Sequence, residues 1–411
     1  MLVFFYYLLV FVIPMPDNPW WAWPIGPLTP MKILGIVCLI AGIAYLAAHS
    51  RWPPFLRLKS GRLFVFLILV ELVSDLFREG LVVGPSVLSN DLAVFSLFIV
   101  TLIFVNSIDR LRKVALIVIG SVAFDSLFVI RQWQGFHNVY GDFRGWGGVA
   151  GDPNYYAISV VLWAPAMILW LTAKRPRWER LYCLGCLLVT LVGFSISASR
   201  GGMLGLTAGL LIVIAYSRHR LRNAAGLGLL VLALGFVSGT SPVSRLLHPT
   251  KSDQESSQDR LDLWHAGLQS IREHPLAGVG VSGFKPKAMR NGVLIDLPFH
   301  VAHNTYVDYA VDLGVVGFVP FVGLLIASLW SLKRLGQKLR RSDPSAILYK
   351  LTLGVEAGIA AYAVSAFFLS TWWQQVFWLS VFLSMCLPFL DSPPLQRLHA
   401  LAVRDEVSEI A

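Results

Sequence analysis

Apolar blocks of helix length, separated by short loops, recur along most of this chain. A helix needs about 20 mostly apolar residues to cross a bilayer, so this pattern restricts the chain to a membrane fold. The composition agrees, because 56% of the residues are hydrophobic and only 14% are charged. We predict an all-α polytopic membrane protein with about twelve transmembrane helices. The predicted spans are 1–14, 31–48, 63–74, 91–106, 114–130, 155–172, 181–197, 203–216, 224–237, 315–332, 351–369 and 376–390.

One long polar segment, residues 238–314, interrupts this pattern between the ninth and tenth spans. Connections within a compact fold are usually short, so a loop of this length with a helix pattern of its own indicates a functional element. We therefore expect nine spans over 1–237, a catalytic loop over 238–314, three spans over 315–390 and a cytoplasmic tail over 391–411.

Positive charge sets the predicted orientation of these spans. With both termini in the cytoplasm, the loops on that side hold most of the lysines and arginines, and the short opposite loops hold few. The long loop then lies outside the cytoplasm. The net charge of +10 follows from this asymmetry and from contact with anionic lipid, so it gives no reason to expect nucleic-acid binding.

Arg200 breaks the charge rule, because it lies on the outer side in the sequence Ser-Ala-Ser-Arg-Gly-Gly at 197–202. The hairpin is so short that the guanidinium must lie at the end of two adjoining helices, partly removed from water. A cation in that position marks an anion site. The alternative is an arginine that reaches out to a lipid phosphate.

A second glycine-rich segment begins at Arg144 and leads into the sixth span. Asp152 or Asn154 is placed to cap that helix, and Pro153 suits its first turn. The glycines would let backbone amides approach a ligand closely. A capped helix start is also common in membrane proteins that bind nothing there.

The long loop contains a predicted amphipathic helix. Apolar residues recur at helical spacing at Leu261, Trp264, Leu268 and Ile271. Pro275 should end this helix, which we expect to lie at the membrane surface with Arg260 at its start directed to a ligand. Arg260 could instead pair with Asp259 or Asp262. The Gly-Val-Gly at 278–280 suggests a tight loop and is weak evidence for phosphate binding.

Two histidines, His300 and His303, precede the tenth span. A histidine at the outer membrane face can act as a base near neutral pH. The pair could instead hold a metal, but no cysteine accompanies it and Asp308 is an unconvincing third ligand. We therefore expect neither a metal site nor a cofactor.

Together these motifs resemble the O-antigen ligase and polymerase superfamily of bacterial membrane glycosyltransferases. Their order and spacing match from about residue 141 to 317. The motifs that carry the resemblance are Gly-Asp-Pro-Asn at 151–154, Ser-Arg-Gly-Gly at 199–202, Arg260 followed by Trp264, His-Pro-Leu-Ala-Gly-Val-Gly at 274–280, His-Asn-Thr-Tyr at 303–306 and Gly-Val-Val-Gly at 314–317.

The resemblance implies a lipid-linked-sugar glycosyltransferase of GT-C-like architecture in the inner membrane, with a periplasmic site. The donor would be a glycan on undecaprenyl pyrophosphate. The acceptor would be a sugar hydroxyl of lipid A–core in the ligase branch, which we favour, another lipid-linked repeat in polymerases, or a protein Ser or Thr. Transfer would be inverting and metal-independent, by a chain surrounded by membrane lipid and expected to be a monomer.

Chemistry then assigns roles to the residues. The leaving pyrophosphate gains negative charge, which Arg200 and Arg260 could stabilise without a metal. His303 would orient or deprotonate the acceptor hydroxyl, and His300 would matter little. The expected substrate-binding residues are Arg144, Asp152, Asn154, Asn304 and Tyr306.

Two other classes compete with an enzyme. A transporter or flippase could also present outer-side cations to an anionic lipid-linked glycan. We find no internal repeat, however, and the intramembrane acids Glu71, Asp75, Asp125 and Glu356 are scattered along the sequence, whereas transporters gather polar sites near the midplane. A non-catalytic scaffold would leave Arg200, Arg260 and His303 unexplained.

Overall fold

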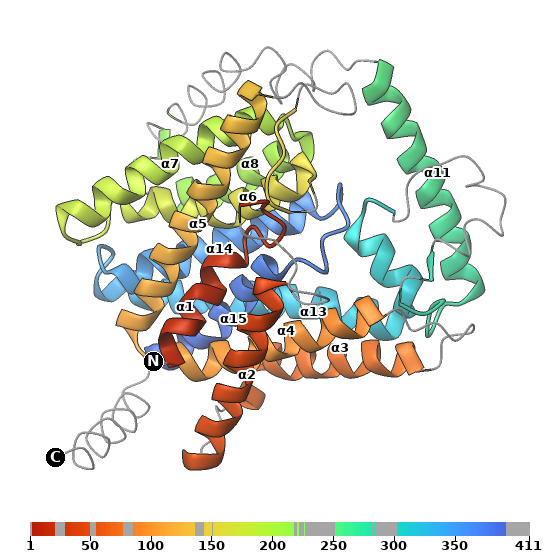
Figure 1. Cartoon of the computed structure of the whole chain (residues 1–411), viewed down its shortest axis with the longest axis horizontal. Helices are drawn as coiled ribbons and strands as arrows, with labels where there is room; N and C mark the ends of the chain where they lie inside the picture. Colours follow the sequence, from red (N-terminus) through yellow and green to blue (C-terminus); the bar gives the residue numbers. More distant parts are fainter. Residues whose placement is uncertain are drawn as a thin grey trace.

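The computed structural model describes residues 2–20, 29–49, 55–76, 85–135, 144–149, 151–217, 220–221, 226, 251–281, 283–284 and 302–391. The regular elements in these ranges are helices, as Figure 1 shows. The elements are α1 (Leu2–Val12), α2 (Pro30–His49), η1 (Phe55–Arg57), α3 (Lys59–Leu76), α4 (Pro85–Phe104), α5 (Ile108–Gly135), α6 (Pro153–Trp170), α7 (Arg177–Ser197), α8 (Arg200–Tyr216), α11 (Lys251–Glu273), α13 (Thr305–Ser342), α14 (Ile347–Ser365) and α15 (Gln375–Leu390).

Five of these helices are long and apolar enough to cross a membrane, namely α2, α5, α7, α13 and α14. Shorter apolar helices, among them α8 and α15, accompany them. Eleven of the twelve predicted spans coincide with a helix, and the ninth, 224–237, lies outside the described residues apart from Gly226. The predicted class, an all-helical polytopic membrane protein, is confirmed.

The centre of the fold is α14, which packs closely between α6 and α8. Glycines allow the close contact on both sides. A Cβ added at Gly205 of α8 would lie 2.5 Å from the carbonyl oxygen of Ala361, and one at Gly358 of α14 would lie 2.9 Å from the carbonyl carbon of Leu162. Small residues let membrane helices approach one another in this way. The starts of α6 and α8 and the end of α14 are thereby brought together.

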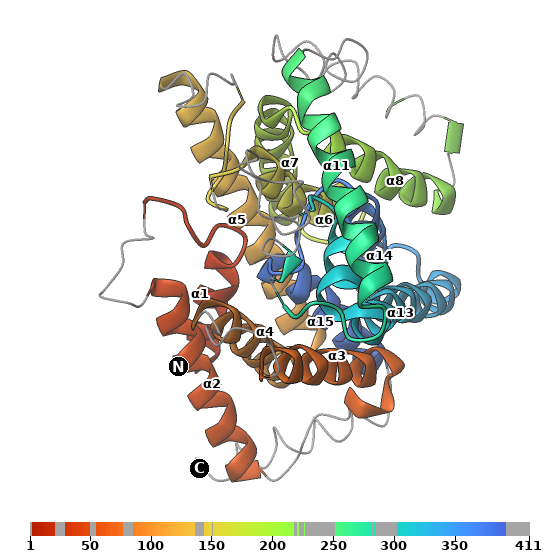
Figure 2. The same ribbon diagram turned by 90° about the vertical axis from the view of Figure 1, so that its right-hand side faces the viewer.

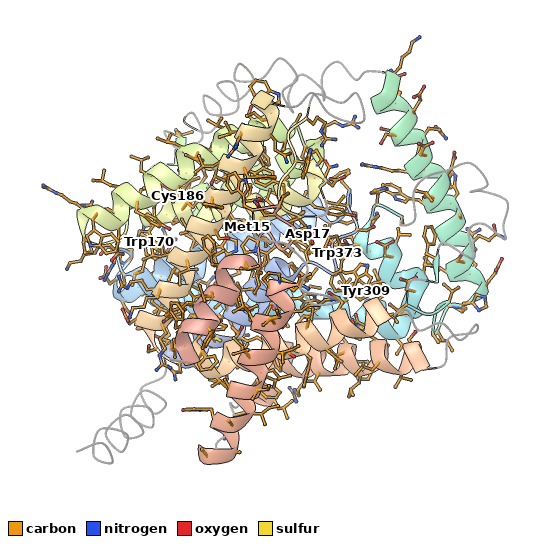
Figure 3. The ribbon with its side chains drawn as sticks, viewed as in Figure 1. Met15, Asp17, Trp170, Cys186, Tyr309 and Trp373 are labelled. Atoms are coloured by element: carbon orange, nitrogen blue, oxygen red, sulfur yellow. The ribbon has the colours of Figure 1, made fainter. Side chains whose placement is uncertain are left out.

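A second layer joins α3, α4, α13 and α15 through aromatic side chains. The ring of Phe64 in α3 lies 4.5 Å from that of Phe98 in α4 and 4.9 Å from that of Phe382 in α15. Tyr309, near the start of α13, stacks on Phe321 with 4.0 Å between ring centroids. Figure 3 shows Tyr309 well inside the molecule. The start of α13 also contacts α3, where the hydroxyl of Tyr309 donates to Glu71.

The polar helix α11 stands at one edge of the molecule (Figure 1) and crosses in front of α13 and α14 in the turned view (Figure 2). It begins nine residues earlier than the sequence predicted and ends before Pro275, as expected. It packs on α13 through a small apolar cluster, the α11 cluster, which consists of Leu263, Ala266, Phe284, Ala302 and Val311.

The apolar residues predicted along this helix divide between two surroundings. Trp264 and Ile271 do pack against the α11 cluster. Leu261 and Leu268, however, are 45% and 47% exposed. Helical spacing alone did not separate the two faces, because the side that meets α13 also uses small residues such as Ala266.

Helix α13 starts inside the segment predicted as loop and is kinked at Gly314, where φ is 59° and ψ is −158°. The turn after α11 docks on this kink: the N–H groups of Val315 and Val316 donate to the carbonyls of Pro275 and Leu276. The predicted boundary at Gly314 is therefore a kink within a helix rather than the start of one.

Candidate functional site

A pocket opens between the starts of α6 and α8, the segment that follows α14, and α11. All three arginines singled out from the sequence line it, as does Asn154. The full lining is Arg144, Asn154, Ile158, Ser199, Arg200, Gly201, Gly202, Ser256, Arg260, Ser365, Phe368 and Leu369. We call it the arginine pocket. It unites residues spread over more than 200 positions of sequence.

Arg144 is held by two neighbours from different helices. Its Nε donates to the carbonyl oxygen of Ser197 at 2.8 Å, and its Nη2 donates to Oδ1 of Asn154, also at 2.8 Å. The same Asn154 oxygen accepts from Ser199 Oγ at 2.9 Å. One amide oxygen therefore ties together the segment of Arg144, the start of α6 and the start of α8, and Asn154 acts mainly by positioning Arg144.

Arg200 lies where the hairpin predicted it. Helix α7 ends at Ser197, Ala198 adopts a left-handed conformation with φ of 48°, and Ser199 caps α8 by accepting from the N–H of Gly202. Arg200 is the first residue of α8. Its side chain therefore lines the pocket at a helix start, where the helix dipole also favours an anion.

Arg260 reaches the same pocket from α11, and Ser256, one turn earlier on that helix, lines it too. The sequence analysis missed Ser256, although its spacing of four residues from Arg260 could have revealed it. Trp264, one turn later, donates from its indole N–H to the carbonyl oxygen of Ala302 at 2.9 Å. This contact explains why a tryptophan follows Arg260 at that spacing.

His303 lies beside this group, within electrostatic reach of Arg260 and Asp152. Burial, reinforced by the Arg260 guanidinium and opposed by the Asp152 carboxylate, lowers the pKa of His303 to about 4. Its imidazole is therefore neutral at physiological pH and able to accept a proton. Its φ of 50° is left-handed, which for a residue other than glycine is a strain of about 1–3 kcal/mol that surrounding contacts must hold.

Three of the predicted substrate-binding residues use their side chains within the protein. Asp152 caps α6 by accepting from the N–H groups of Asn154 and Tyr155, which confirms the predicted cap. Asn304 caps α13 in the same way through the N–H groups of Tyr306 and Val307. The hydroxyl of Tyr306 donates to the carbonyl oxygen of Ala363 at 2.7 Å. These residues shape the site, and a direct role in binding substrate stays a prediction.

The remaining sequence motifs have structural explanations or lie outside the described residues. Gly278 and Gly280 adopt positive φ and form the tight loop expected, and the N–H of Gly280 donates to the carbonyl of Asp312 rather than facing the arginine pocket. His300 lies outside the described residues. Within the part of the chain that is described, no group of three His, Cys, Asp or Glu side chains is arranged to hold a metal.

Two of the acidic residues that are scattered in the sequence, Glu71 and Asp125, have separate partners in the structure. Glu71 of α3 accepts a hydrogen bond from Tyr309 Oη at 3.1 Å, and with Asp308 and Asp312 it lines a second, smaller pocket. Asp125 of α5 instead accepts from the N–H of Gly148 at 2.8 Å, which anchors the segment that carries Arg144. Neither pairing was predictable from the sequence.

The fold and the site define an all-helical membrane protein with a cationic pocket beside a neutral histidine. Residues 185–322 match the family model described as O-antigen ligase. This region holds Arg200, Arg260 and His303, whereas Arg144 and Asn154 precede it. Residues 185–322 are thus similar to the O-antigen ligase family, and the resemblance to that superfamily predicted from the sequence is confirmed.

Two relatives of low sequence identity are also named as ligases. The chain is 28% identical over 167 residues to an O-antigen ligase of Pseudomonas aeruginosa, covering 40% of this chain and 37% of that protein. It is 24% identical over 204 residues to a Rickettsia conorii protein named provisionally as a polysaccharide ligase, covering 46% and 47% of the two chains. An uncharacterized Haemophilus influenzae protein is 23% identical over 194 residues, which is 42% of this chain. The chain therefore spans less than half the length of these relatives.

Proposed function

We propose that this protein is an O-antigen ligase of the bacterial inner membrane, with the arginine pocket on the periplasmic side. It would transfer a glycan from undecaprenyl pyrophosphate to a sugar hydroxyl of lipid A–core during lipopolysaccharide biosynthesis. The convergence of Arg144, Arg200 and Arg260 in one pocket carries this proposal. The ligase reaction is preferred to polymerisation because the family description and the Pseudomonas relative both specify a ligase.

The pocket suits a pyrophosphate in charge and in donor geometry. Guanidinium groups bind phosphate oxygens through paired N–H donors, and their charge does not titrate in the physiological range. Arg200 and Arg260 reach the pocket from separate helices, so they can contact different oxygens of one ligand. The start of α8 adds backbone N–H groups and a positive dipole end. A divalent cation is not required for charge balance in this arrangement.

Transfer breaks the bond between the anomeric carbon and the pyrophosphate oxygen and forms a bond from that carbon to the acceptor oxygen. The departing oxygen keeps the bonding electron pair, and Arg200 and Arg260 stabilise the charge that develops on it. His303 takes the proton from the acceptor hydroxyl. Attack from the face opposite the leaving group would invert the configuration of the anomeric carbon.

The environment of His303 would make its basicity depend on the donor. The Arg260 charge is one cause of its low pKa, after burial. A pyrophosphate bound to Arg260 would offset that charge and raise the pKa of His303. The imidazole would then be a stronger base in the donor complex than in the free protein.

Purified protein with lipid-linked glycan and lipid A–core tests the proposal. Wild type should form the ligated product, whereas Arg200→Ala and Arg260→Ala should each lower the rate at least about a hundredfold, as loss of a transition-state donor does. Lysine at either position should restore little, because it lacks the planar fork.

The control is Arg272→Ala, which removes an exposed cation near the other end of α11. It should retain nearly full activity. Wild-type turnover by Arg200→Ala and Arg260→Ala at normal expression would exclude both residues from the mechanism. Transfer of a single repeat onto another lipid-linked repeat would instead identify a polymerase.

A further inference from the structure

Ala302, the residue just before His303, is held by hydrogen bonds at both its carbonyl oxygen and its N–H. The carbonyl oxygen of Ala302 accepts from the indole N–H of Trp264 at 2.9 Å, and its N–H donates to Oδ1 of Asp308 at 3.0 Å. Ala302 is fully buried and Asp308 is 3% exposed. Hydrogen bonds removed from water in this way are strong and directional. We call this pair of contacts the Ala302 clamp.

The other side of His303 is equally fixed. Asn304 caps α13, and the N–H of Thr305 donates to the carbonyls of Ala366 and Leu369. Leu369 itself lines the arginine pocket. His303, with its left-handed backbone, therefore stands between two anchored points. Strained backbone of this kind persists only where neighbouring contacts over-determine it.

Helix α11 connects the clamp to the arginine pocket. Trp264 follows Arg260 by four residues, so both side chains lie on one side of the helix, one turn apart. One of them lines the pocket and the other holds the residue before His303. The turn of α11 from Arg260 to Trp264 therefore sets the position of His303 relative to Arg260.

We propose that Trp264 and Asp308 are positioning residues, which hold His303 at a fixed place relative to Arg260 so that it meets the acceptor hydroxyl. Neither residue touches the substrates in this scheme. The proposal rests on the function given to His303 above. It predicts that loss of the clamp slows transfer at saturating donor without weakening the binding of donor.

Four variants test the clamp. Trp264→Phe keeps a ring but removes the N–H donor, and Asp308→Leu removes the acceptor. Both should lower the single-turnover rate about tenfold to a hundredfold, as misplacement of a catalytic group does, with half-saturating donor concentration within about twofold of wild type. Asp308→Asn keeps an oxygen for the Ala302 N–H and should retain most activity. Trp163→Phe is the matched control, because Trp163 is buried but its indole N–H has no hydrogen-bond partner among the described residues.

A pH titration separates positioning from a general structural effect. Among the described residues, the charged groups that act on His303 are Arg260 from α11 and Asp152 from the start of α6. Release of His303 toward water should raise its pKa in Trp264→Phe, which ¹⁵N NMR of the labelled imidazole in nanodiscs can follow. An unchanged pKa, or equal losses of rate and donor affinity, would overturn the proposal even if Asp308→Leu fails to fold.

The activity of His303→Ala tests the catalytic function of His303 separately from the Ala302 clamp. If that variant transfers glycan at the wild-type rate, the catalytic function proposed for His303 is wrong. The imidazole titration in Trp264→Phe still decides whether the clamp holds this side chain, because it needs no transfer reaction.

Discussion

The residues of this site are of two kinds. Some line the arginine pocket, and others hold the pocket-lining residues in place through hydrogen bonds. Arg200 and Arg260 line the arginine pocket, while Asn154 joins Arg144 to Ser199. Asp152 and Asn304 use side-chain oxygens as helix caps. An alanine at a capping position costs about 1 kcal/mol of stability in addition to any effect on substrate. Loss of activity at Asp152 or Asn304 therefore does not by itself indicate contact with substrate.

Arg260→Gln should raise the pKa of His303 from about 4, because it removes a nearby positive charge that disfavours protonation. The value should stay below the ordinary 6.5, since burial is the larger cause and remains. ¹⁵N NMR of the labelled imidazole measures this shift. Arg272→Gln on the same helix serves as the control and should leave the titration unchanged. A lower or identical pKa in Arg260→Gln would show that the charge of Arg260 does not lower the pKa of His303.

Among the helices, the contact of α8 with α14 positions Arg200. Gly205 lies on the face of α8 that meets Ala361, and Arg200 begins the same helix little more than one turn earlier. A neighbouring face of α14, at Gly354 and Gly358, meets α6, whose second residue is Asn154. The positions of the residues that line the arginine pocket therefore depend on the close packing of α14 with α8 and α6.

Gly205→Ala should destabilise the protein by about 1–3 kcal/mol, because the added methyl group has to push α8 away from the backbone of α14. Thermal unfolding in detergent should show a lower midpoint, accompanied by slower transfer as Arg200 shifts. Gly185→Ala is the matched control, since a Cβ there has nothing within 4 Å. Equal unfolding midpoints for the two variants would show that the close contact of α8 with α14 does not contribute to stability.

The parts of the site that the sequence could predict are those set by local geometry. Arg200 was predictable because a connection of two residues places it at the start of the next helix. The Asp152 cap was predictable because it depends only on residues 152–155. The bond from Trp264 to Ala302 was not, because it depends on how α11 packs on α13. Glu71 gave no local signal either, since its partner Tyr309 is 238 residues away.

The whole molecule is an all-helical membrane protein in which α11 crosses in front of α13 and α14 (Figure 2) and lines one side of the arginine pocket. The pocket draws cations from the segment after α5, from the start of α8 and from α11. Three cations gathered around one pocket repel one another unless an anion occupies the space between them. A pyrophosphate on a lipid fits both this charge and a membrane setting.

Binding of undecaprenyl pyrophosphate to the purified protein in EDTA tests the central claim most directly. Native mass spectrometry in nanodiscs can compare this lipid with undecaprenol, which has the same chain but no phosphate. We predict clear preference for the pyrophosphate in wild type and in Arg272→Ala, and its loss in Arg200→Ala and Arg260→Ala. Equal binding of both lipids by wild type, or a preference that appears only when magnesium is added, would contradict a pyrophosphate site built from arginines.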